Sequence, residues 1–229
     1  MYSTAPGRGA QAQESAVNRQ GARSVGLART RRLYRMQAPL HAQVPGHPLH
    51  VIQRGYCRVA CFLCERDRAA YLHWLGAYAG RLGCAVHAYV LMGNHVHLLL
   101  TPSRPEGASR LMHALGERYT RYIGEAHERS GPLLEKSFKA LSLRSRRHLL
   151  DCMRYIESNP VRARLVAAPG DYRWSSFRAN ALGRDDPLVT PHSSYYALGR
   201  SAASRQAAYL ALFRGEPSAP EPRRTGVRA

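Results

Sequence analysis

The residues best suited to chemistry stand in the stretch Met-Gly-Asn-His-Val-His at positions 92–97, where His95 and His97 flank a valine. Successive side chains of a β-strand point to opposite faces, so the two histidines would project from the same face. Two neutral imidazoles placed in this way can bind one divalent metal ion. A pair of hydrogen-bonded core histidines is the simpler alternative. The stretch therefore predicts a metal site if a catalytic partner exists elsewhere in the chain.

Tyr155 and Asn159 could supply that partner, because residues four apart share one face of a helix. A phenolic oxygen becomes a nucleophile when it loses its proton, and the amide oxygen of Asn159 could complete a His-His-Asn set for Mg²⁺ or Mn²⁺. A cation held there could withdraw charge from a scissile phosphate. A core tyrosine and a helix C-cap are the ordinary alternatives. Spacing alone does not choose among the 13 tyrosines, which include Tyr89, Tyr119 and Tyr122.

Alternating strands and helices are expected to position these groups. Apolar runs bounded by turn residues predict strands at 49–54, 84–92, 95–102 and 136–143. Helical spacing predicts helices at 67–82, 108–126 and 146–158. Asn159-Pro160 is expected to end the last of these helices, because a residue that precedes proline disfavours helical angles.

This order of elements is typical of an α+β fold, the ferredoxin-like split βαβ arrangement with an antiparallel sheet. Its helices are expected to cover one face of the sheet. We assign residues 45–183 to a catalytic domain and 184–215 to a C-terminal helical extension. Residues 1–44 are interpreted as a disordered basic arm and 216–229 as a disordered tail.

The charge of the chain points to an acidic partner. Lys and Arg total 34 against 15 Asp and Glu, a formal net charge of +19, and Lys136 and Lys139 are the only lysines. Arginine binds phosphate through two parallel hydrogen bonds and stacks on bases, so this excess favours nucleic acid. No run of eighteen apolar residues predicts a membrane span, and no apolar signal core opens the chain. A cytoplasmic protein without a membrane partner is expected.

Cys57, Cys61 and Cys64 raise a different hypothesis, because their spacing is that of the cluster-binding triad of radical SAM enzymes. Three thiolates so close together could hold an iron–sulfur cluster. The triad lies between a strand and a helix of a different fold, however, and the repeated strand–helix units of a barrel are missing. In a cytoplasmic protein, free thiols are the expected state.

Four blocks of the sequence resemble the REP-associated tyrosine transposases, a branch of the single-tyrosine transposases with a His-hydrophobic-His motif. They are His-Val-Ile-Gln-Arg-Gly at 50–55, Tyr-Val-Leu-Met-Gly-Asn-His-Val-His at 89–97, Arg-Tyr-Ile-Glu-Ser-Asn-Pro-Val-Arg-Ala at 154–163 and Tyr-Arg-Trp-Ser-Ser at 172–176. The resemblance runs from about Leu33 to Phe213. Leu-Glu-Lys-Ser-Phe at 134–138 departs from the Trp-Glu-Gly-Arg-Phe-like run of that family.

The resemblance implies that Tyr155 is the nucleophile and that Asn159 joins His95 and His97 as a ligand of Mg²⁺ or Mn²⁺. It also implies cutting and rejoining of single-stranded or hairpin DNA near short palindromic repeats, through a 5′-phosphotyrosine. A domesticated DNA-binding protein that does not cut is the alternative. The presence of His95, His97 and Tyr155 together argues against it.

Arginines near the proposed site are expected to contact DNA phosphates, a solvated charged face being the alternative. They are Arg54 at the end of the first strand and, flanking the tyrosine helix, Arg144, Arg146, Arg147, Arg162 and Arg164. A monomer or a homodimer is expected.

Overall fold

The computed structural model describes residues 44–214. The predicted tail and all but Val44 of the predicted basic arm therefore lie outside the described residues. The elements are, in order, β1 (Leu49–Arg54), η2 (Tyr56–Arg58), α2 (Glu65–Arg81), β2 (Cys84–Leu91), β3 (His95–Pro102), α3 (Gly107–Ala126), β4 (Lys139–Ser142), α4 (Arg146–Arg162), η3 (Pro169–Asp171), α5 (Phe177–Leu182), α6 (Ser193–Tyr196) and α7 (Ala202–Ala211). None of the described helices is long and apolar enough to cross a membrane.

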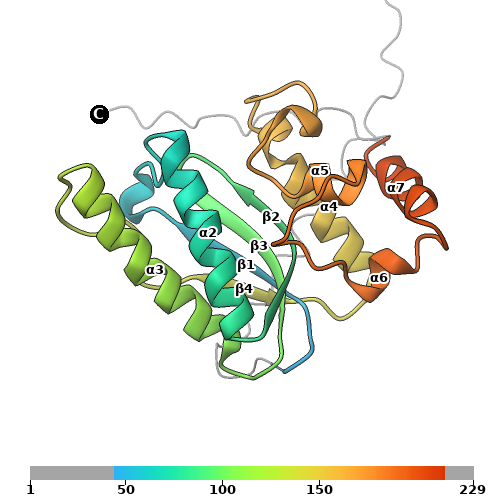
Figure 1. Cartoon of the computed structure of the whole chain (residues 1–229), viewed down its shortest axis with the longest axis horizontal. Coiled ribbons are helices and arrows are strands. Elements are labelled where there is room, and N and C mark those ends of the chain that lie inside the picture. Colours follow the sequence, from blue (N-terminus) through green and yellow to red (C-terminus); the bar gives the residue numbers. More distant parts are fainter. Residues whose placement is uncertain (1–43, 215–229) are drawn as a thin grey trace, which may run out of the picture. The chain divides into compact units, whose positions relative to one another are not determined.

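The centre of the fold is a four-stranded sheet in the order β2-β3-β1-β4 (Figure 1). All neighbouring strands are antiparallel, and β1 pairs with both β3 and β4. The two crossover helices, α2 and α3, each join strands that are not neighbours in the sheet. This confirms the predicted α+β fold with the ferredoxin-like split βαβ order.

One face of the sheet packs against α2 and α3. Val51 of β1 and Leu98 of β3 are fully buried there, in one cluster with Leu75 of α2 and Leu111 of α3. The apolar positions of both helices recur at helical spacing, so each helix turns a continuous stripe toward the strands. The hydrophobic effect therefore fixes α2 and α3 on this face.

The opposite face of the sheet packs against α4. Val90 of β2 and Leu99 of β3 form a second cluster with Met153 and Ile156 of α4. The expectation that helices cover one face only is therefore wrong for α4. The reason lies in the run Leu98-Leu99-Leu100, which is buried throughout and presents apolar side chains to both faces.

Helix α4 continues through Pro160 to Arg162, so the expectation that Asn159-Pro160 ends it is wrong. Proline has no N–H, and the carbonyl of Ile156 therefore loses its helical donor. The side-chain amide of Asn159 donates to that carbonyl at 3.3 Å and to the carbonyl of Tyr155 at 2.7 Å. The asparagine thus replaces the missing hydrogen bond and lets the last turn form.

The segment after α4 packs against α4 through a buried carboxyl group. Glu157 is fully buried. It accepts hydrogen bonds from Ser176 at 2.6 Å, Asn180 at 2.8 Å and Tyr209 at 2.7 Å. These donors come from the start of α5, from α5 itself and from α7. Because Glu157 stands between Tyr155 and Asn159, the C-terminal helices support the part of α4 that carries both residues.

Candidate active site

His95 and His97 project from the same face of β3, as the alternation of the strand predicts. Their ring centroids are 5.0 Å apart. His97 is 2% exposed, whereas His95 at the beginning of the strand is partly accessible. In the register with β1, His97 stands opposite Ile52 and His95 opposite Arg54. The two imidazoles therefore lie together near one end of the sheet.

The Nδ1 atom of each histidine has a hydrogen-bond partner. Nδ1 of His95 lies 2.7 Å from Oδ1 of Asn94. Nδ1 of His97 lies 2.9 Å from Nε2 of His50, a buried residue of β1 whose ring is stacked on that of His97. Sequence reasoning assigned no site role to His50 or Asn94. The available signal was a histidine inside the apolar strand Leu49–Ile52.

All three imidazoles favour the neutral form. Burial lowers the pKa of His50 and of His95 to about 4, and the cation of Arg54 contributes at His95. Burial also holds the pKa of His97 well below its ordinary value, with further contributions from His50, His95 and Arg54. A neutral imidazole keeps one nitrogen lone pair. The site is therefore suited to a metal ion near neutral pH.

Tyr155 reaches this histidine cluster from α4. Its ring centroid is 5.7 Å from that of His97 and 6.0 Å from that of His50, with edge-to-face geometry in both cases. The guanidinium of Arg162 lies 5.4 Å from the centroid of the same tyrosine ring. The fold thus joins residues from β1, β3 and α4 around one aromatic ring.

The other tyrosines that spacing could not separate from Tyr155 have structural roles. The hydroxyl of Tyr89 donates to Asp186 at 2.8 Å, and that of Tyr119 donates to the carbonyl of Cys61 at 2.7 Å. The hydroxyl of Tyr122 donates to Asp67 at 3.2 Å. None of these contacts involves a site histidine, which leaves Tyr155 as the candidate nucleophile among these four.

Asn159 lies one helical turn beyond Tyr155 on the same face of α4. Both hydrogen bonds of its amide nitrogen go to carbonyls of its own helix. The amide oxygen is thereby left as the atom that could bind a cation. The helix C-cap is Ala163, so the alternative role of Asn159 as that cap does not hold.

The six arginines do not form one group. Arg54 faces His95 across the β1–β3 register, and Arg162 stacks on Tyr155. Arg164 follows the end of α4, with a positive φ of 58°. The remaining three lie at the start of α4, where Arg146 donates to the carbonyl of Ala197 and Arg147 is paired with Asp151. Since α4 has 17 residues, its two ends are about 25 Å apart.

The cysteines do not form a cluster site. Cys57 and Cys64 are exposed, Cys61 is buried, and all three are free thiols. Burial raises the pKa of Cys61 to about 12, which disfavours the thiolate that an iron–sulfur cluster requires. The radical SAM hypothesis therefore gains no support from the structure.

Cys64 instead lies close to Asp67 and His127, with one ligand atom of each within 4.8 Å of the others. Such a group could hold a metal ion. Its geometry is also what a helix cap requires, because Asp67 accepts from the backbone N–H groups of Leu63 and Cys64 and from the ring of His127. We therefore treat it as a cap that joins α2 to the end of α3.

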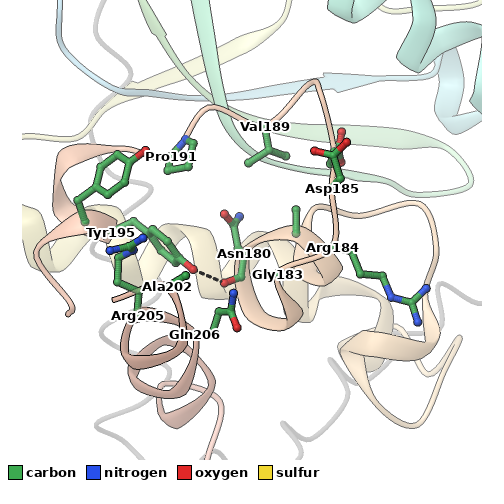
Figure 2. Close-up of a pocket in the computed structure, with 13 residues that line it drawn as sticks. Asn180, Gly183, Arg184, Asp185, Val189, Pro191, Tyr195, Ala202, Arg205 and Gln206 are labelled. Carbon is green, nitrogen blue, oxygen red and sulfur yellow. Dashed lines mark hydrogen bonds between the residues drawn. The ribbon is translucent and has the colours of Figure 1, made fainter. Parts of the chain in front are cut away.

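A separate cavity of about 300 Å³ lies among the C-terminal helices (Figure 2). In Figure 2 the hydroxyl of Tyr195 points to Asn180, and it donates to the carbonyl of Asn180 at 2.6 Å. Charged residues of both signs line the cavity, including Arg184, Asp185 and Arg205. None of the residues predicted for the active site lines it.

A ferredoxin-like sheet with a His-hydrophobic-His strand, and a tyrosine helix packed over it, is the arrangement expected for a transposase of the kind that the sequence motifs indicated. The family described as "Transposase IS200 like" matches residues 43–159, about half of the chain. The chain belongs to this family and is a DNA-processing enzyme. The resemblance to transposases that the sequence motifs indicated is thus confirmed. No curated protein sequence matches the chain.

Among solved structures, a REP-associated tyrosine transposase bound to a REP hairpin is similar in fold, with a TM-score of 0.56 and 18% identity. The match covers 69% of this chain and 96% of that one. A Deinococcus radiodurans protein described as a transposase has a TM-score of 0.37 at 23% identity, with 54% of this chain and 97% of that one covered. A bacterial tRNA(His) guanylyltransferase-like protein in complex with GTP also has a TM-score of 0.37, at 13% identity, with 64% and 77% covered.

Proposed function

We propose that this transposase cuts and rejoins single-stranded or hairpin DNA with Tyr155 as the nucleophile and a divalent metal ion as its cofactor. The observation that carries the proposal is the packing of the Tyr155 ring against His97 and His50. The contact joins a helix to the sheet across more than fifty residues of sequence, so it is a property of the fold. It brings Tyr155, the tyrosine of the sequence block at 154–163, to His97, one of the two proposed histidine ligands.

The donor set fits Mg²⁺ or Mn²⁺. His95 and His97 would each offer Nε2, because Nδ1 of both rings is engaged by another residue. Asn159 would offer its amide oxygen, since its nitrogen is bound to helix carbonyls. Two imidazoles and one neutral oxygen leave coordination positions for water and a phosphate oxygen. When bound, the cation would neutralise charge on a phosphate and orient it for in-line attack.

Tyr155 is the attacking group of the proposed covalent step. The oxygen of Tyr155 would lose its proton to water and form a bond to phosphorus, and the bond from phosphorus to the 3′ oxygen would break. The leaving 3′ oxygen takes a proton and departs as a hydroxyl, while the 5′ end stays joined to the tyrosine. Reversal by a 3′ hydroxyl restores the strand and frees Tyr155, because the phosphodiester energy is conserved in the phosphotyrosine.

DNA is the partner that the family and the charge favour. The net charge of +19 provides the attraction to phosphates, and the solved relative of similar fold is described as bound to a REP hairpin. Arg54 and Arg162 would contact the phosphates next to the scissile bond. Arg144, Arg146 and Arg147, at the other end of α4, would contact a more distant part of the same DNA. The active species would be a monomer or a homodimer.

The test is a cleavage assay with the wild-type protein and Tyr155→Phe. Each is incubated with Mn²⁺ and single-stranded hairpin oligonucleotides taken from the flanks of its own gene, and the products are separated on a denaturing protein gel. We expect a DNA-linked protein band with wild type that is lost with Tyr155→Phe and with a chelator. Tyr122→Phe is the matched control, because Tyr122 bonds to Asp67 and should retain the band.

DNA binding on a native gel without a covalent band, across several metals and hairpins, would contradict the proposal. That result would favour the domesticated DNA-binding protein instead. A covalent band that survives in Tyr155→Phe would leave the transposase activity intact but would assign the nucleophile to another residue.

A further inference from the structure

The two histidines proposed as ligands share a feature that their motif does not specify. Each has its Nδ1 atom within hydrogen-bond distance of a side chain from outside the proposed ligand set. For His95 the partner is Asn94 at 2.7 Å, and for His97 it is His50 at 2.9 Å. The Nε2 atoms of His95 and His97 therefore lie on the opposite side of each ring from these partners.

The chemistry of neutral imidazole limits which ring nitrogen of each histidine can bind a metal ion. A neutral ring carries one N–H and one lone pair, so only the nitrogen without the proton can bind a metal. Oδ1 of Asn94 can only accept, and this fixes the proton of His95 on Nδ1. The hydrogen bond between His50 and His97 contains one proton, which is carried either by Nε2 of His50 or by Nδ1 of His97. His97 binds a cation through Nε2 only when its own Nδ1–H donates and His50 accepts.

We propose that His50 and Asn94 are positioning residues that select the tautomers of His97 and His95 in which Nε2 is the metal ligand. The inference rests on the proposed function, because it assigns these residues a role toward the same cation. Each ligand is then positioned from a different element: His97 by a residue of β1, and His95 by a residue of the turn between β2 and β3.

The turn that carries Asn94 is itself held in place by the loop around η2. The amide nitrogen of Asn94 donates to the carbonyl of Arg58 at 3.3 Å, which orients the oxygen toward His95. The backbone N–H of Gly55 donates to the carbonyl of Asn94 at 2.9 Å, and that of Cys61 donates to Gly93 at 2.8 Å. Cys57 and Arg58 adopt positive φ angles of 48° and 60° in this loop.

Such strained backbone persists only where the surroundings fix it, and it is common beside functional sites. Here the strained loop contacts the residue that orients His95. In the proposed arrangement, the cysteine-containing loop supports Asn94 and does not hold an iron–sulfur cluster.

A histidine elsewhere in the sheet provides the matched control. His87 of β2 is also buried, and its ring nitrogens contact the carbonyl of Thr190 at 2.6 Å and the hydroxyl of Thr101 at 2.7 Å. It has no contact with His95 or His97 among the interactions of the described residues. His87→Phe should therefore reproduce the loss of a buried strand histidine without touching the ligands.

The first readout is the ring ¹⁵N spectrum of the metal-free protein, which distinguishes the two tautomers of each histidine. We expect His95 and His97 to carry their protons on Nδ1 in wild type. His50→Phe should move the proton of His97 toward Nε2, and Asn94→Ala should do the same for His95, whereas His87→Phe should change neither. His97 protonated on Nε2 in wild type would overturn the proposal.

The second readout is the affinity for Mn²⁺ alone, measured by titration without DNA. His50→Phe and Asn94→Ala should each bind Mn²⁺ roughly tenfold or more weakly, as is typical when a partner of a ligating histidine is removed. His50→Gln supplies an amide oxygen in place of the accepting ring nitrogen, and Asn94→Asp keeps an oxygen acceptor, so both should recover most of the affinity. His87→Phe should bind as wild type does.

If wild type binds Mn²⁺, and His50→Phe and Asn94→Ala bind it with the same affinity, this inference is overturned and the proposed function stands. Wild-type protein that does not bind Mn²⁺ would overturn the metal site of the proposed function, and the present inference with it.

Discussion

Replacing Glu157 with glutamine should change how the stability of the protein depends on pH. Burial of Glu157 raises the pKa of its carboxyl group from the ordinary 4.5 to about 7, although the donors Ser176, Asn180 and Tyr209 partly oppose the shift. In the unfolded chain the same group would titrate at its ordinary value. Between these two pKa values the folded protein holds a proton that the unfolded chain has released.

The sign of the effect follows from this difference. Stability from a raised carboxyl pKa is fully present below the unfolded value and is lost as the pH rises through the folded value. From about pH 5 to about pH 8, wild type should lose about 2 to 3 kcal/mol of unfolding free energy through Glu157. Glu157→Gln stays neutral and loses none of it. The variant should therefore gain about that amount relative to wild type over this range.

The assay is chemical denaturation at several pH values, followed by the fluorescence of Trp74 and Trp174 with a chelator present. His50 and His95 have lowered pKa values and contribute the opposite slope, because their folded forms release protons first. This contribution is the same in both proteins, so the difference between them isolates Glu157. A difference that stays constant from about pH 5 to about pH 8 would show that Glu157 is ionised throughout, and would refute the reasoning.

Arg162→Gln should weaken binding to single-stranded DNA of any sequence and reduce the salt dependence of log affinity by about 0.7, the value for one phosphate contact on a single strand. An unchanged slope in a salt titration would show that Arg162 does not contact phosphate. Asp67→Ala should lower the unfolding free energy by about 2 to 4 kcal/mol, because two backbone N–H groups and two side chains lose a buried acceptor. Its affinity for Mn²⁺ should stay that of wild type, and a loss of that affinity would assign the metal to Asp67 and its neighbours.

Local sequence patterns determine the strands of this protein well. The bounds predicted for the first strand match β1, and the third strand ends at Pro102 as expected. The alternation of β3 also places His95 and His97 on one face. These features depend on neighbours within a few residues, such as the Gly93-Asn94 turn, so they can be predicted from the sequence.

Residues that meet through the tertiary fold could not be derived in this way. His50 contacts His97 because β1 and β3 pair in one particular register, 47 positions apart. The side of the sheet on which α4 packs depends on how the apolar faces of α2, α3 and α4 are divided between the two faces of the sheet. Pro160 was expected to end α4, and propensity alone does not include the side-chain amide that compensates for its missing N–H.

The support of α4 by distant residues has a consequence for the order in which the protein matures. The hydrogen-bond partners of Glu157 extend to Tyr209, near the end of the described chain, whereas the histidine strand is complete about a hundred residues earlier. Chains fold from their N-terminus as synthesis proceeds. A nascent or prematurely ended chain would thus form the sheet and its histidines while the tyrosine helix still lacks its final packing. The proposed cutting of DNA would then require the chain at least as far as Tyr209, whose hydroxyl completes the support of Glu157.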